Sequence, residues 1–77
     1  MSYDERKVDE TCLALLRLTS FKHRGVTRAW KGMAWEVLDR LHEQGWIYDP
    51  RSKAKSVVFT DEGLQRSQEL FEELFRG

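Results

Sequence analysis

The sequence has one cysteine, one proline and no long apolar run, and each shortage excludes a class of protein. One cysteine in 77 residues cannot form an intramolecular disulfide, which excludes a disulfide-stabilised secreted fold and suits a reducing compartment. No apolar stretch approaches the ~18 residues that a membrane-spanning helix needs. The first residues, MSYDE, lack the basic and then apolar layout of a secretion signal. We therefore expect a cytoplasmic protein with no membrane partner.

Motifs for catalysis and for metal binding are also missing. The sequence contains no paired-carboxylate constellation, Ser-His-Asp set or phosphate-cradling glycine loop. Cys12, His23 and His42 do not have the spacing of metal ligands. Cys12 also falls on the apolar stripe of a predicted helix, where a buried, unreactive thiol is the expected role. We expect no enzymatic activity, no cofactor and no metal.

The length predicts a single domain, residues 1–77, with a marginal core. A chain of this size buries only ~60% of its unfolded surface, so pairing with a second copy would add burial. The last predicted helix carries more apolar side chains than a helix that only covers a core requires. These side chains are the candidate dimer interface: Leu70, Phe71, Leu74 and Phe75.

Helical periodicity predicts the first and last elements. An apolar stripe predicts a helix from about Asp4 to Ser20, and Ser2 and Glu5 have the spacing of a capping box. A second stripe predicts a helix over residues 61–75, with Thr60 as its N-cap and two acidic residues in its first turn. Residues 21–26 are expected to form a basic connector, because Gly25 would interrupt a helix.

The middle of the chain allows two interpretations. Thr27 can cap a helix over residues 28–44, in which Trp30, Ala34 and other apolar residues recur at helical spacing. Alternatively, the helix breaks at Gly32 into a helix-turn-helix. We favour one helix, bent at Gly32. Trp35 lies off the main stripe and is either part of a second core face, which we prefer, or an exposed aromatic for a partner.

A β-hairpin is predicted to follow. Residues 46–48 and 56–60 are short aromatic and β-branched runs, and the residues between them have turn composition around Pro50. Alternation predicts that Ile47 and Phe59 pack on the helices. The fold class is therefore mainly α with a two-stranded β-hairpin (α+β), in the order α-α-β-β-α.

Residues 33–75 resemble the closing half of bacterial winged-helix regulators. The resemblance rests on Leu38-x-x-Leu41-x-x-x-Gly45-Trp46-Ile47, on the basic hairpin, and on Phe59-Thr60-Asp61-Glu62-Gly63. It implies a winged-helix-like fold with the hairpin as the wing. The run RAWKGMAWEVLDRLHEQGWIYDPRSKAKSVVFTDEGL also resembles a small bacterial family of unknown function, which implies no particular activity.

Basic and acidic residues are equal in number, but they are unevenly distributed along the chain. The net charge is zero, yet residues 21–35 carry four basic residues and no acidic one, and residues 51–60 carry three more. A winged helix would bring these two segments together on a nucleic-acid-binding side. The simpler interpretation is that solvated loops often carry lysine and arginine. The candidate nucleic-acid-binding residues are Arg28, Lys31, Arg51, Lys53 and Lys55.

Two functional hypotheses follow. The first is a dimeric nucleic-acid-binding protein of the transcriptional-regulator type. Against duplex binding, Glu36, Asp39 and Glu43 would give the central helix an acidic surface. The second is a protein-interaction or dimerisation module without DNA binding. It would use either the acidic helix faces or the aromatic residues Trp30, Trp35, Trp46 and Phe71.

Overall fold

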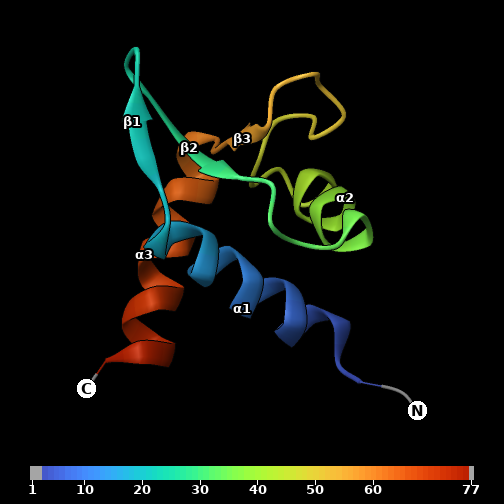
Figure 1. Ribbon diagram of the computed structural model, residues 1–77. Helices are drawn as coiled ribbons and strands as arrows, with labels where there is room; N and C mark the ends of the chain where they lie inside the picture. Colours follow the sequence, from blue (N-terminus) through green and yellow to red (C-terminus); the bar gives the residue numbers. More distant parts are fainter. Residues whose placement is uncertain (1–2, 77) are drawn as a thin grey trace.

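Three helices and a three-stranded antiparallel sheet form an α+β fold in the computed structural model, which describes residues 3–76. Along the chain the order is α-β-β-α-β-α, and the strands lie in the order β1-β2-β3 (Figure 1). The elements are α1 (Glu5–Leu18), β1 (Phe21–His23), β2 (Val26–Trp30), α2 (Trp35–Glu43), β3 (Ser56–Val58) and α3 (Asp61–Phe75).

The core lies between the helices and one face of the sheet. α1 packs against α3 and also contacts α2 and β2 (Figure 1). Ala29 of β2 and Val57 of β3 are partners in the ladder, and both are buried, so their face of the sheet is the one that meets the core. The largest apolar side chains of the core come from all three helices and from the segment around β3: Leu13, Leu16, Leu38, Leu41, Ile47, Phe59 and Leu70.

The predictions for the first and last helices are confirmed, and α1 begins one residue later and ends two residues earlier than expected. α1 starts after Asp4, whose carboxylate accepts hydrogen bonds from the backbone N–H groups of Arg6 and Lys7. The predicted capping box involves Ser2, which lies outside the described residues. α3 has the predicted bounds, and the Thr60 hydroxyl accepts a hydrogen bond from the Gly63 N–H at 2.9 Å.

The predicted helix over residues 28–44 is wrong in its first seven residues. Residues 26–30 form β2, and Thr27 pairs with Lys22 in the sheet instead of capping a helix. The helical spacing of Trp30 and Ala34 is coincidental, because both residues are exposed. β2 is the central strand and pairs on both sides, so tertiary pairing overrides the local helical pattern.

Residues 21–26, expected to be a connector, instead begin a hairpin. Arg24 and Gly25 form its two-residue turn, with φ of 53° and 82°. Positive φ at both central residues is the requirement of a type I′ turn, whose twist matches that of the strands. The glycine that was expected to interrupt a helix therefore makes the β1–β2 connection possible.

The predicted hairpin of residues 46–48 and 56–60 is present only in part. β3 forms, but its partner over three residues is β2, from Arg28↔Val58 to Trp30↔Ser56. The first predicted strand is reduced to one bridge, Ile47↔Phe59. These two side chains are buried, as predicted. Residues 49–55 form a loop that connects the bridge to β3 and that carries the second basic segment.

None of the helices within residues 3–76 combines the length and the apolar character needed to cross a membrane.

Candidate nucleic-acid interface

Pairing between β2 and β3 brings the two basic segments of the sequence together. The Lys31 backbone N–H donates to the Lys55 carbonyl at 3.0 Å, which continues the β2–β3 ladder beyond the strands. The Lys31 ammonium also donates to the Ser52 carbonyl at 3.0 Å. Figure 1 shows the β1–β2 turn and the loop before β3 in the upper part of the view, away from α1. We call the predicted site residues together the cationic surface: Arg28, Lys31, Arg51, Lys53 and Lys55.

Two of these cations are held against Trp35, the first residue of α2. The Arg51 guanidinium carbon lies 4.6 Å and the Lys31 ammonium 5.6 Å from the centroid of a Trp35 ring. Such cation–π contacts are worth about 0.5–1 kcal/mol at exposed sites. The preferred prediction, that Trp35 belongs to a second core face, is wrong, because the residue is 48% exposed. It instead anchors the loop of residues 49–55 through basic side chains of its own chain.

Arg51 is further tied to Asp39 of α2. Its Nη2 and Nε donate to the two carboxylate oxygens at 2.7 and 3.3 Å. The hydrogen bond from Arg51 lowers the pKa of Asp39, and the same bond raises the pKa of Arg51. Arg51 therefore acts mainly to position the loop, and its charge is partly compensated by Asp39.

The other cations of this surface keep their charge uncompensated. In the part of the chain that the structure describes, Arg28, Lys31, Lys53 and Lys55 have no carboxylate within salt-bridge distance. Lys53 and Lys55 are exposed. Arg28 is half-buried, and its Nε donates to the Ser56 hydroxyl at 2.7 Å. These uncompensated cations can bind phosphates of a polyanion.

The sequence analysis missed the open face of the sheet. Alternation along β1 and β2 places one set of side chains on the face of the sheet opposite to that of Ala29. These side chains line a hollow of about 720 Å³. They are Phe21, His23, Val26, Arg28 and Trp30, with Arg24 and Ser56 at the edge of the hollow. Phe21 and Trp30 are in contact, with ring centroids 5.0 Å apart. Alternating residues in FKHRGVTRAW would have indicated this face, had the segment been recognised as a hairpin.

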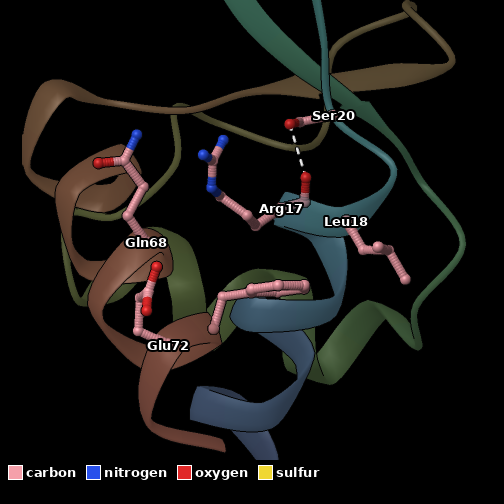
Figure 2. A pocket seen from close by; sticks show the side chains of 6 residues that line it. Arg17, Leu18, Ser20, Gln68 and Glu72 are labelled. Atoms are coloured by element: carbon pink, nitrogen blue, oxygen red, sulfur yellow. Dashed lines mark hydrogen bonds between the residues drawn. The ribbon is translucent and has the colours of Figure 1, made fainter. Parts of the chain in front are cut away.

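A second hollow, of about 640 Å³, lies between the C-terminal half of α1 and α3. Arg17 from α1 and Gln68 and Glu72 from α3 point toward the same space (Figure 2). Ser20 donates a hydrogen bond to the Arg17 carbonyl at 2.7 Å, which fixes the end of the helix. The side chains that line this hollow do not include a nucleophile paired with a base. The hollow is a groove between two packed helices.

The four residues predicted for a dimer interface differ in their exposure. Leu70 is 3% exposed and belongs to the core, so it cannot form part of an external contact surface. Phe71 is half-buried and packs edge-on against Phe75, with centroids 5.4 Å apart. Leu74 and Phe75 are 49% and 43% exposed. Only these last two present a large apolar surface at the end of α3.

The cysteine and the two histidines belong to different elements, α1, β1 and α2. Cys12 is half-buried on α1, and burial raises the pKa of its thiol, which disfavours the nucleophilic thiolate. His42 Nδ1 lies 3.0 Å from the Ile47 carbonyl, while His23 is exposed on β1. Within residues 3–76, no three metal-ligating side chains gather into a potential metal site.

Comparisons with known proteins match the chain over almost its full length. The family model described as "Domain of unknown function (DUF6429)" matches residues 4–77. The "Uncharacterized protein y4hR" of Sinorhizobium fredii (strain NBRC 101917 / NGR234) is 56% identical over 75 residues, which cover 97% of each chain. No solved structure matches the chain significantly. On the strength of both matches, the chain belongs to the bacterial family described as Domain of unknown function (DUF6429).

Proposed function

We propose that this protein binds nucleic acid through the cationic surface. The observation that carries the proposal is the β2–β3 pairing, which makes neighbours of basic segments that fifteen residues separate in the sequence. Between them, residues 21–35 and 51–60 contain seven basic residues and no acidic one. A surface of this kind attracts the phosphate backbone, and the release of counterions favours binding.

The proposal assigns phosphate contacts to the loop of residues 49–55 and to β2, with no recognition helix. In a winged-helix interpretation this loop would take the part of the wing. α2 is poorly suited to the major groove, because it has nine residues, exposed Glu36 and Glu43, and a first residue, Trp35, that already contacts the chain's own cations. Binding would therefore depend on the backbone more than on duplex sequence.

Salt-dependent binding tests this proposal. Fluorescence anisotropy with short labelled DNA and RNA oligonucleotides should show binding at ~50 mM salt that weakens steeply toward ~200 mM. The double substitution Lys53→Ala/Lys55→Ala should reduce affinity at least tenfold at low salt and reduce the log–log salt slope by about 2, because two phosphate contacts are lost. Both side chains are exposed, and the Lys55 carbonyl that bonds Lys31 is retained.

The matched control is Arg6→Ala/Lys7→Ala. These two residues are exposed in the first turn of α1, and their removal changes net charge by the same amount. The N-terminal end of α1 and the loop before β3 lie at opposite ends of the view in Figure 1. The control should retain the wild-type affinity. An absence of binding at low salt, or equal losses in the two double variants, would refute the proposed function.

The second candidate function is self-association through the end of α3. The exposure of Leu74 and Phe75 favours it, and a small domain gains core by pairing. Sedimentation velocity across a range of concentrations should then show a dimer that Phe75→Glu converts to monomer, because the substitution places charge in an apolar contact. A wild-type monomer at every concentration would rule out this candidate.

A further inference from the structure

We infer that the nucleic acid is single-stranded and that its bases stack on Trp30 at the open face of the sheet. The inference rests on the proposed function. It adds the class of nucleic acid that is bound and the contact that distinguishes a single strand from a duplex. Its basis is the juxtaposition of the exposed Trp30, in contact with Phe21, with the cations of β2 and of the β1–β2 turn.

The open face has no helix over it within the described part of the chain. The helices meet the opposite face, where Ala29 and Val57 are buried. On the open face Trp30 is 58% and Val26 39% exposed. A large indole left in water on the open face contributes little to this core, and stacking with a ligand would bury its surface.

Phe21 supports Trp30 in a fixed orientation. The two rings are 5.0 Å apart between centroids and inclined by 35°. Phe21 is half-buried and sits opposite Arg28 in the β1–β2 ladder. The contact with Phe21 occupies part of the indole, and the exposed remainder is available to the planar face of a base. Stacking of this kind tolerates any base, since every base has a π face.

Charge on the same face complements a single strand. Arg28 is held by its Nε–Ser56 hydrogen bond, and no acidic residue occurs between residues 21 and 35. Arg24 lies in the turn at the edge of the hollow. Phosphates can thus lie along these cations while a base reaches Trp30. In a duplex the base faces are covered by neighbouring pairs, so only an unpaired strand can make both contacts.

Comparison of an oligothymidylate with an abasic oligonucleotide of equal length isolates the stacking. Both carry the same phosphates, and only the first has bases. The wild-type protein should bind the oligothymidylate about tenfold or more tightly than the abasic strand, and more tightly than a duplex of that length. Trp30→Ala should remove the preference for bases while leaving affinity for the abasic strand unchanged, and Trp30→Phe should retain most of the preference.

The outcomes separate this inference from the proposed function. Equal wild-type affinity for the thymidylate and abasic strands, or equal affinity for the duplex, overturns the inference and leaves phosphate binding intact. An absence of binding to all three probes at low salt overturns the proposed function as well. The comparison of probes with the wild-type protein does not depend on the folding of any variant. Unchanged abasic binding by Trp30→Ala shows in addition that this variant is folded.

Discussion

Gly63→Ala is expected to destabilise the protein by more than about 3 kcal/mol. Gly63 is buried in the first turn of α3 and faces the backbone of Trp46. A Cβ at this position would overlap the Trp46 carbonyl group and lie 2.6 Å from its Cα. Urea unfolding followed by circular dichroism would measure the loss, which we expect to appear in the transition midpoint.

The obstructing atoms cannot move aside, which is why the expected loss is large. The Trp46 N–H donates to the Leu41 carbonyl at 3.0 Å, and the Trp46 carbonyl accepts from the Thr60 N–H at 3.1 Å. The Thr60 hydroxyl also donates to the Gly45 carbonyl at 2.6 Å. These bonds fix the connection after α2 against the start of α3, so a methyl group would force the two segments apart.

Gly32→Ala is the matched control, because a Cβ there would meet nothing within 4 Å and the residue does not have a positive φ. It should leave stability unchanged or raise it by about 0.4–1 kcal/mol through the smaller entropy of the unfolded chain. A Gly63→Ala protein as stable as the Gly32→Ala protein would contradict the close approach seen at Trp46.

The parts of the fold that could be predicted are those that local signals specify. Thr60 and the two acids after it predicted the start of α3, and the close approach at Gly63 now supplies the physical reason for the glycine in the Phe59-Thr60-Asp61-Glu62-Gly63 motif. The apolar stripe likewise predicted α1. N-caps and helical periodicity act within a few residues, so the sequence alone is sufficient.

The central position of β2 in the sheet could not be predicted from local signals, because its partner β3 is distant in the chain. β2 lies between β1 and β3, and Arg28 pairs with both Phe21 and Val58. The helical spacing of Trp30, Ala34 and Leu38 competed with the strand pattern and was the stronger local signal. Residues 26–30 form a strand because they pair with β1 across the Arg24–Gly25 turn and with β3 across α2 and a long loop.

The candidate site divides in the same way. Charge counting found the two basic segments, and the structure places them side by side along β2 and β3. The aromatic half of the site was missed, since Phe21 and Trp30 come together only when residues 21–30 form a hairpin. Trp35 was predicted to belong to a second core face. Its contacts with Lys31 and Arg51 depend on the folded loop of residues 49–55, which helical spacing does not reveal.

Removal of the Arg40 side chain is expected to be the most damaging change outside the core. Asp9 of α1 is 6% exposed, and its two oxygens accept three hydrogen bonds from the Arg40 guanidinium of α2, at 2.8 to 3.0 Å. Glu5 lies 3.5 Å from the same group. Arg40→Met would leave a buried carboxylate without a partner, and breaking such a pair costs far more than the pair itself contributes. The thermal midpoint near pH 7 should fall by roughly 10 °C or more.

The double substitution Asp9→Leu/Arg40→Met shows whether Arg40→Met loses stability through an unpaired buried charge or through lost packing. If the unpaired Asp9 carboxylate causes the loss, replacing both partners by apolar side chains should recover most of the thermal midpoint, because no charge is then buried. Arg76→Met is a control, since Arg76 pairs with Glu72 on the exposed end of α3 and should change the midpoint little. The opposite outcome is that the double variant loses as much thermal midpoint as its two single substitutions together. The α1–α2 contact would then depend on packing of the arginine stem, and not on the ion pair.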